Sequence, residues 1–218
     1  MQFNQKRFNW ATGLMLMLMS LVVVTQFQPL SAQTDSAKLV DVRSLNPNIA
    51  LDIRYATKNN FVKQQLYRQA KCFLRASVAE KLSRVQTELA TQGLGLKVYD
   101  CYRPLSVQKR LWQIKPDPNY VANPVNGSRH NRGAAVDLTL VDRTGKTLEM
   151  PTDFDDFSDR ASRNYNQLSN AAKTNRATLA RVMVKYGFVP LETEWWHFDA
   201  KDWQQFPLTD VSFEALTL

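Results

Sequence analysis

Histidine is nearly absent from this sequence: the 218 residues include only two, His130 and His197. Cysteine is equally rare, and because Cys72 and Cys101 form no CxxC pair, we do not expect a zinc site built on cysteines. The chain also lacks an internal repeat and a low-complexity linker, which favours a single domain. It has no stripe of basic residues interleaved with aromatic ones, so we expect no nucleic acid partner.

The composition is that of an ordinary globular protein, with 44% hydrophobic and 22% charged residues. A chain of 218 residues is long enough to bury a substantial core. The formal net charge is +8, but the basic residues are scattered along the chain, as on any solvated surface. Composition therefore excludes a disordered or fibrous protein, but it does not indicate the function. For that we turn to local motifs.

The sequence has no clear membrane span, which needs about 20 consecutive apolar residues. The apolar stretch from Leu14 to Val24 is shorter, follows two basic residues and precedes small ones, a pattern typical of a secretory signal peptide. We therefore predict a signal peptide over residues 1–32 and a domain over 33–218. The domain would be exported to the periplasm or cell envelope, without stable membrane insertion after cleavage. An uncleaved anchor is the alternative, because the bulky Leu30 lies close to the expected cleavage point.

Export makes a disulfide between Cys72 and Cys101 chemically reasonable. Such a bond would close a loop of about 30 residues and stabilise the fold by about 3 kcal/mol in the chain-entropy model. Two buried free thiols are the alternative, which the spacing alone does not exclude, but we favour the disulfide.

Hydrophobic patterns along the chain predict alternating strands and helices. Strands are expected over 39–42, 49–56, 96–102 and 135–142, with a hairpin turn leading into 147–150. Helices are expected from 77 to about 93, from 106 to 116 and from 169 to 186. Ser77 and Glu80 have the form of a capping box, and Ser106 is the expected cap of the second helix. These elements favour an α+β fold with a largely antiparallel central sheet flanked by helices.

Two short segments carry the residue types of a metal site. Asp137 lies in an apolar strand, where a carboxylate is costly to bury unless it is paired or binds a metal. Alone, Asp137 could face water, and His130 could be a surface histidine. Glu194 and His197 flank two tryptophans in a second segment. Catalytic zinc commonly takes three ligands from His, Asp and Glu, so His130, Asp137 and His197 would suffice, with Glu194 left as a base.

The spacing of Glu194 and His197 predicts a local departure from strand geometry. Side chains three residues apart in a regular strand face opposite sides of the sheet. We therefore expect Glu194 on a turn or bulge just before the strand, so that both side chains reach one site. Trp195 or Trp196 would exclude water there and raise the basicity of Glu194, although both could be core residues.

Five motifs together resemble a known family. SRHNRGAAVD matches the pattern SxHxxGxAxD, and EWWH matches ExWH. These two motifs resemble the zinc D,D-peptidases of the VanX-type D-alanyl-D-alanine dipeptidase family. DIRYATKNNF, DCYRP and MPTDFDDF also look like the family's segments in the same order, so the resemblance covers nearly all of residues 33–218. It implies the zinc D,D-peptidase (hedgehog-like) fold.

The resemblance implies one Zn²⁺ per chain, held by His130, Asp137 and His197. Glu194 would be the general base that takes a proton from water and returns it to the leaving amine. Bound zinc would polarise the scissile carbonyl. Arg103, in DCYRP, would stabilise the negative charge that develops on the carbonyl oxygen.

The same resemblance implies three substrate-binding residues. Ser128 would hold the substrate carboxylate, and Tyr55 and Asp155 would lie around the free amine. Each has a structural alternative: Tyr55 could be a core residue, and Asp155 could belong to a solvated acidic loop. Arg103 could likewise be only a salt-bridge partner.

The resemblance implies hydrolysis of the D-Ala-D-Ala dipeptide to free D-alanine, in turnover or recycling of cell-wall peptides. The nearest alternative is a zinc D,D-carboxypeptidase that trims peptidoglycan stem peptides and meets a neutral amide where a dipeptide presents an ammonium. A noncatalytic wall-binding module is a more distant alternative, because binding alone does not need Glu194. A structural zinc domain is another, but it would usually hold the metal with four protein ligands, often cysteines, and both cysteines lie outside these motifs. The sequence predicts no oligomeric state.

Overall fold

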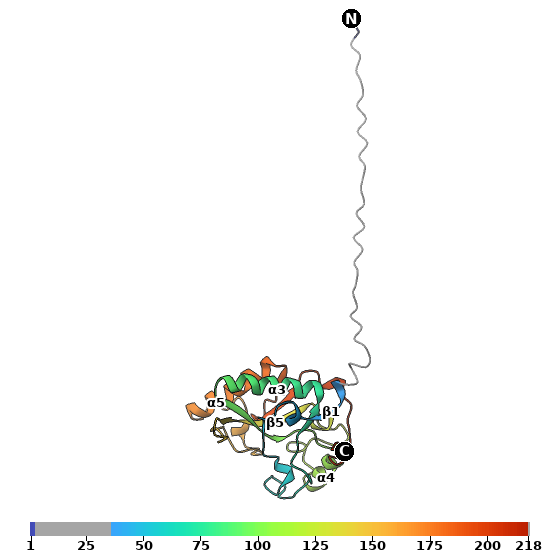
Figure 1. Cartoon of the computed structure of the whole chain (residues 1–218), viewed down its shortest axis with the longest axis vertical. Helices are drawn as coiled ribbons and strands as arrows, with labels where there is room; N and C mark the ends of the chain where they lie inside the picture. Colours follow the sequence, from blue (N-terminus) through green and yellow to red (C-terminus); the bar gives the residue numbers. More distant parts are fainter. Residues whose placement is uncertain (3–35, 218) are drawn as a thin grey trace.

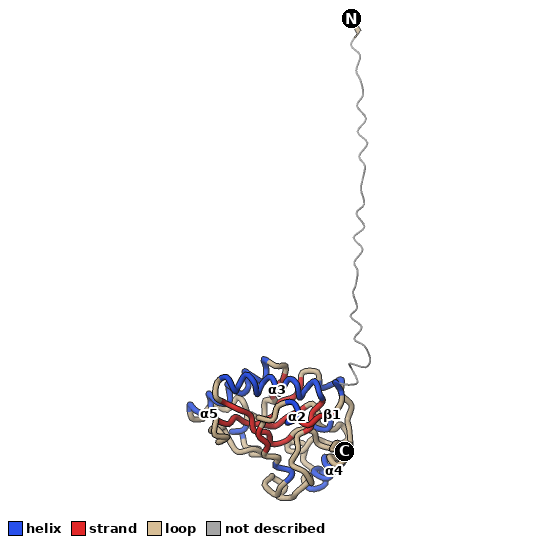
Figure 2. The backbone as a smooth tube through the Cα atoms, in the orientation of Figure 1, coloured by secondary structure: helices blue, strands red, loops and turns tan. Residues whose placement is uncertain are grey.

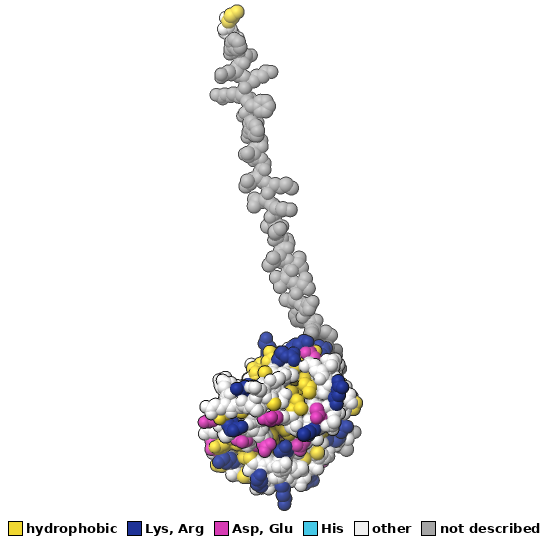
Figure 3. Space-filling model, turned by 90° about the vertical axis from the view of Figure 1, so that its left-hand side faces the viewer, with side chains coloured by type: hydrophobic (Ala, Val, Ile, Leu, Met, Phe, Trp, Pro, Cys, Tyr) yellow, Lys and Arg dark blue, Asp and Glu magenta, His cyan; other side chains and the backbone are white. Residues whose placement is uncertain are grey.

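The structure is a computed structural model that describes residues 1–2 and 36–217 (Figure 1). The predicted signal peptide, apart from residues 1–2, lies outside the described residues. Within the described part of the chain, no helix is long and apolar enough to cross a membrane. On the face drawn in Figure 3, Lys and Arg side chains lie dispersed among acidic and uncharged ones.

A central five-stranded sheet organises the fold (Figure 2). Its strands, in spatial order, are β2 (Ala50–Leu51), β4 (Leu94–Asp100), β5 (Ala135–Asp142), β7 (His197–Ala200) and β6 (Phe188–Pro190). Only the β2–β4 pair is parallel, and the other three pairs are antiparallel. A second, two-stranded sheet pairs β1 (Leu39–Asp41) with β3 (Phe73–Arg75). The expected α+β fold with a largely antiparallel sheet is confirmed.

The helices surround this sheet. They are α2 (Val42–Leu45), α3 (Ala76–Thr91), α4 (Leu105–Ile114) and α5 (Asn170–Lys185). Short 3-10 turns are η1 (Arg54–Ala56), η2 (His130–Arg132), η3 (Asp159–Ala161) and η4 (Trp203–Gln205). Helix α3 packs against β4 and α5 on one face of the sheet, whereas α4 lies at the opposite end of the molecule in Figure 1.

Helix α3 forms where expected, but its start differs from the expectation. It begins at Ala76, and no side chain caps it, so the capping box of Ser77 and Glu80 was wrong. Strand β3 runs directly into the helix, and the Ala76 N–H donates instead to the carbonyl oxygen of Lys38. A backbone carbonyl just before β1 thus satisfies this amide at the helix start.

Helix α4 is capped from a distant part of the chain. Pro104 occupies the N-cap position, so the prediction of Ser106 as the cap was wrong. The Ser106 N–H donates to Asp210 Oδ1 at 2.7 Å. This carboxylate lies close to the positive end of the helix, where a negative charge is stabilising.

Helix α5 agrees with the sequence. The Ser169 hydroxyl accepts from the Ala172 N–H at 3.0 Å, and Gly187 follows the helix with φ of 87°. Leu179, Val182 and Met183 are fully buried on its inner stripe. Here the hydrophobic periodicity and the local cap residues predict the same helix, so the sequence alone was sufficient to place it.

The strand predictions hold best at the centre of the sheet. Strand β5 has the expected bounds, and both of its faces are buried. The expected strand over 147–150 is only an isolated bridge between Val141 and Thr147. The expected strand over 49–56 is reduced to β2, because the backbone turns into η1 at Arg54.

Cys72 and Cys101 form the expected disulfide, and both are buried. Cys72 directly precedes β3 and Cys101 directly follows β4, so the bond joins the small sheet to the central one. It thereby fixes the segment that enters the DCYRP motif.

Candidate active site

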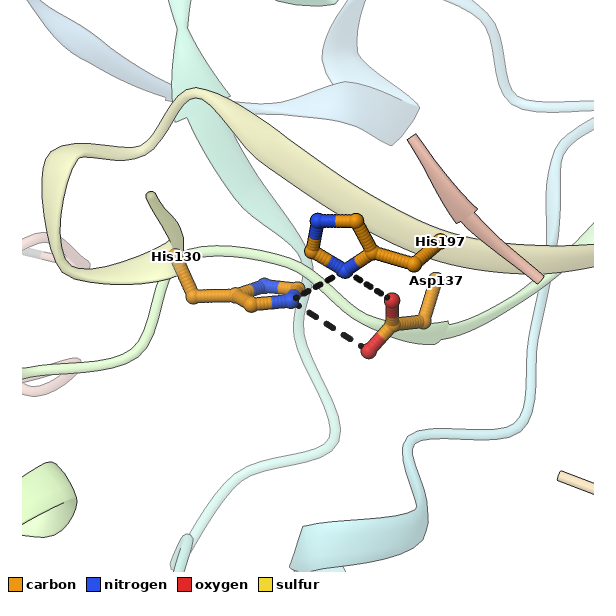
Figure 4. A group of neighbouring side chains, drawn as sticks. All are labelled: His130, Asp137 and His197. Atoms are coloured by element: carbon orange, nitrogen blue, oxygen red, sulfur yellow. Dashed lines mark hydrogen bonds and ion pairs between the residues drawn. The ribbon is translucent and has the colours of Figure 1, made fainter. Parts of the chain in front are cut away.

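Two neighbouring strands bring Asp137 and His197 together. Asp137 on β5 is the register partner of His197, the first residue of β7. His130 comes from η2, and the three side chains converge as Figure 4 shows. His197 Nδ1 lies 2.9 Å from Asp137 Oδ1, and His130 Nε2 lies 3.3 Å from both Asp137 Oδ2 and His197 Nδ1. All three residues are buried, and their ligand atoms lie within 4.8 Å of one another.

The orientation of His130 is set by the backbone around it. Its Nδ1 lies 2.7 Å from the carbonyl oxygen of Cys101, which can only accept, so Nδ1 carries the proton. Nε2 is therefore the ring nitrogen that faces Asp137 and His197. Gly133 ends the η2 turn in the left-handed conformation, with φ of 67°. This glycine lets the chain turn from His130 into β5 within a few residues.

A carboxylate that sequence reasoning missed holds His197. Asp199 Oδ1 lies 2.9 Å from His197 Nε2, which leaves Nδ1 directed at the centre of the site. Such an outer hydrogen bond commonly fixes a metal-ligating histidine. Arg129 Nε lies 3.6 Å from Asp199 Oδ2, and the Arg129 guanidinium lies over the Trp203 ring. The i, i+2 spacing of His197 and Asp199 on one strand face was the signal that could have revealed this contact.

The ionisable side chains of the site are suited to bind a cation. Burial alone would raise the pKa of Asp137, but His130 and His197 hold this pKa well below its usual range. Burial alone would lower the pKa of His197, but hydrogen bonds to Asp137 and Asp199 raise it to about 10. Two imidazole nitrogens and one carboxylate are also a ligand set that catalytic zinc takes. The residues present therefore fit a zinc ion.

Glu194 lies where the spacing predicted, in a turn just before β7. Its Oε2 lies 3.9 Å from His197 Nδ1. Burial raises the pKa of Glu194, while His197 lowers it. Trp196 lines the cavity beside Glu194, whereas the Trp195 indole N–H donates to Thr152 Oγ1. The structure thus assigns the apolar wall near Glu194 to Trp196.

Arg103 is a buried salt-bridge partner that also lines the cavity. Its Nε and Nη2 donate to Asp100 Oδ2 at 3.2 and 2.6 Å, and its Nη1 donates to Gln108 Oε1 at 2.9 Å. Burial lowers the pKa of Arg103, but Asp100 outweighs this effect and keeps the guanidinium charged. The same guanidinium lines the cavity and lies over the Tyr55 ring. Asp100, in DCYRP, is a second buried carboxylate that sequence reasoning missed.

Asp155 is a cavity residue rather than part of a solvated loop. Tyr55 Oη donates to Asp155 Oδ2 at 3.2 Å. Burial raises the pKa of Asp155 well above its usual value, and the nearby Asp137 raises it further. Asp155 also has φ of 60°, a conformation that is uncommon outside glycine and concentrates at functional sites.

Ser128 also lines the cavity, at the entrance to η2. Its hydroxyl oxygen accepts from the His130 N–H at 3.2 Å. Because that bond uses only an acceptor site, the hydroxyl hydrogen remains able to donate to a ligand.

All of the sequence-predicted site residues line one cavity of about 250 Å³. They are Tyr55, Arg103, Ser128, His130, Asp137, Asp155, Glu194 and His197. A buried His–Asp–His set with an adjacent carboxylate and a fixed guanidinium defines the class of a metal-dependent hydrolase.

Comparisons with known proteins give the family. The profile of the peptidase family described as D-ala-D-ala dipeptidase matches residues 35–214. The D-alanyl-D-alanine dipeptidase of Escherichia coli K12 is 37% identical over 182 residues, covering 84% of this chain and 94% of that protein. The D-alanyl-D-alanine dipeptidase of Enterococcus faecalis V583 is 30% identical over 186 residues, covering 74% of this chain and 90% of that protein.

A solved structure is similar at greater distance. The crystal structure of the vancomycin-resistance D,D-dipeptidase VanXYg, in complex with a D-Ala-D-Ala phosphinate analogue, is 21% identical, with a TM-score of 0.40. The match covers 62% of this chain and 53% of that chain. From the profile and the E. coli relative, the chain belongs to the D-alanyl-D-alanine dipeptidase family of zinc peptidases.

Proposed function

We propose that this protein hydrolyses the dipeptide D-Ala-D-Ala to two molecules of D-alanine in a zinc-dependent reaction. The observation that carries the proposal is the position of the Tyr55–Asp155 pair in the same small cavity as the metal-ligand set. A free dipeptide presents an ammonium close to its scissile bond, and a buried carboxylate is the group that binds it. The names of the relatives described above support the same substrate.

Three residues would hold the metal and one would move protons. His130, Asp137 and His197 would ligate zinc, which when bound supplies a Lewis acid that polarises the scissile carbonyl. Glu194 would remove a proton from the attacking water as the C–O bond forms, and would return it to the amine nitrogen as the C–N bond breaks. The raised pKa of Glu194 suits this role, because a stronger base accepts the proton more readily.

Arg103 would stabilise the charge that develops on the carbonyl oxygen. Its bonds to Asp100 and Gln108 hold the guanidinium in place before the reaction, so no reorganisation is needed when the charge appears. Ser128 would donate its free hydroxyl hydrogen to the substrate carboxylate.

Asp155 would distinguish a free dipeptide from a peptide with a blocked amine. Burial and the nearby Asp137 raise the pKa of the Asp155 carboxyl, and a substrate ammonium would stabilise its charged form by pairing with it. An N-acylated peptide brings a neutral amide instead and leaves the buried carboxyl without that partner. This difference favours the dipeptidase over the D,D-carboxypeptidase.

Amine release by the zinc-loaded enzyme tests the proposal. Free D-Ala-D-Ala should be cleaved, and an N-acylated stem peptide with the same C-terminal pair should not. Cleavage of the blocked peptide would make the protein a carboxypeptidase and remove the assigned role of Asp155. Cleavage of neither peptide would favour the alternative of a noncatalytic wall-binding module.

We also propose one zinc ion per chain, because the His–Asp–His set is a single three-residue group. Metal analysis of the purified protein should give a zinc-to-chain ratio near one. A ratio near two would require a second site.

We further propose export to the periplasm or cell envelope, where the enzyme would recycle D-Ala-D-Ala released from the wall. The apolar stretch after Lys6 and Arg7 supports a signal peptide, and a disulfide persists in an oxidising compartment. Cell fractionation with N-terminal sequencing tests this. Recovery of the protein in the cytoplasm with residues 1–32 intact would contradict it.

A further inference from the structure

Three aromatic rings from three separate loops meet at the active cavity. Phe61 follows η1, Tyr120 follows α4, and Phe157 precedes η3. The Phe157 ring is the central one: its centroid lies 5.3 Å from that of Phe61 and 4.9 Å from that of Tyr120, both edge to face. We call Phe61, Phe157 and Tyr120 the aromatic roof. None of them is a metal ligand, base or charged substrate contact.

The aromatic roof forms one part of the cavity lining. All three rings line the cavity, yet each side chain also keeps some exposure to solvent. The Phe157 ring contacts Trp196, which lies beside Glu194. The Phe61 ring contacts Tyr55, which pairs with Asp155. Edge-to-face contacts of this kind favour a defined ring arrangement over a loose apolar cover.

A second cavity lies directly behind Phe61. It has a volume of about 380 Å³, and its polar lining includes Arg54, Asn59 and Asp153. Phe61 and Asp155 line both cavities, so these two side chains form the partition between them. Since Asp155 is assigned to the substrate amine, a residue added before the dipeptide would run into this partition.

We propose that the aromatic roof sets the length of the substrate, by closing the space beyond the dipeptide amine. The proposal rests on the proposed dipeptidase function and adds a steric limit to the electrostatic selection by Asp155. A tripeptide with a free N-terminus still carries an ammonium, but its extra residue needs the space that Phe61 fills. Admitting it would break ring contacts on Phe157 and expose apolar surface to water.

The test compares two free peptides, D-Ala-D-Ala and the tripeptide L-Lys-D-Ala-D-Ala, with the zinc-loaded enzyme. Phe61→Ala joins the two cavities, and Tyr120→Ala opens the roof from its exposed side. Each substitution should raise the ratio of kcat/KM for the tripeptide to kcat/KM for the dipeptide by roughly 10- to 100-fold. Tyr120→Phe keeps the ring and should keep the wild-type ratio. Val125→Ala is the matched control, because Val125 is 84% exposed in the same loop as Tyr120.

The outcomes separate the two proposals. If wild type cleaves the dipeptide but the ratio is unchanged in both alanine variants, the roof proposal is overturned and the dipeptidase stands. If wild type cleaves the tripeptide with the same kcat/KM as the dipeptide, the roof does not limit substrate length and the proposal is overturned. If wild type cleaves neither peptide, the dipeptidase function fails and the roof proposal fails with it. Tyr120 is 39% exposed, so Tyr120→Ala should fold even if Phe61→Ala does not, and circular dichroism checks this.

Discussion

The Nδ1 atom of His130 lies 2.7 Å from the carbonyl oxygen of Cys101, so a disulfide-bonded residue orients a histidine of the candidate metal site. Cys101 also stands between Asp100, which holds Arg103, and the turn into α4. The disulfide to Cys72 therefore fixes the segment from which both His130 and Arg103 take their orientation.

Removal of this disulfide should destabilise the fold. Cys72→Ser with Cys101→Ser should lower the free energy of unfolding by about 3 kcal/mol, because the unfolded chain regains the freedom of the closed loop. Denaturant titration measures the change. Wild type in reducing agent should behave like the double variant, and equal midpoints for oxidised and reduced protein would contradict the prediction.

Asp199 should contribute to zinc affinity without touching the metal. Asp199→Ala frees the His197 ring to rotate, which should weaken zinc binding by about 10- to 100-fold. Competition with a chelator measures the dissociation constant. Asp199→Asn is the matched control, since its amide oxygen still accepts from Nε2 and should retain most of the affinity. An unchanged dissociation constant in Asp199→Ala would remove Asp199 from this role.

Zinc affinity should fall as the pH falls. The pKa of His197 is raised to about 10, so its ring is protonated at neutral pH. A metal ion must replace the proton on Nδ1, and a higher proton concentration therefore opposes binding. For one displaced proton, the apparent association constant should rise roughly tenfold per pH unit below that pKa. Calorimetry in two buffers of different ionisation enthalpy should show proton release, and its absence would contradict the assignment of Nδ1.

Glu194 should be needed for turnover but not for metal binding. Glu194→Ala should keep the zinc content and lower kcat by about 100- to 10,000-fold, because the water loses its base. Glu194→Gln, of nearly the same shape, should lose a similar amount. Metal analysis and steady-state kinetics on the same preparations test this. Loss of zinc from either variant would mean that Glu194 is a ligand and that the ligand set is misassigned.

Arg103 should affect both rate and stability, and a second substitution separates the effects. Arg103→Ala should lower kcat by about 100- to 1,000-fold through the lost oxyanion contact. It should also destabilise the fold by about 3–5 kcal/mol, because Asp100 is left buried and unpaired.

Adding Asp100→Asn to Arg103→Ala removes that unpaired charge. The double variant should recover part of the thermal stability and none of the turnover. If turnover returned together with stability, Arg103 would be a structural salt-bridge partner only.

The sequence predicted the elements that local interactions determine and missed those that depend on contacts between distant segments. Helix α5 was predictable because its apolar stripe, its Ser169 cap and Gly187 are all local features. The cap of α4 was not, because Asp210 lies about a hundred residues from Ser106 and only folding brings them together. The strand expected over 49–56 was cut short by the turn at Arg54, which hydrophobic pattern alone does not reveal.

The candidate site shows the same division. By itself the sequence predicted the donors, because the chain has only two histidines, Asp137 lies in an apolar strand, and both motifs resemble those of a zinc peptidase family. The spacing of Glu194 and His197 predicted a turn or bulge before the strand. The tertiary structure decided which groups orient those donors: Asp199 and the Cys101 carbonyl for the histidines, and Asp100 for Arg103. It also decided that Trp196, rather than Trp195, forms the wall beside Glu194. The physical reason is that residue type sets what a side chain can bind, whereas its direction depends on packing and hydrogen bonds between segments distant in the chain.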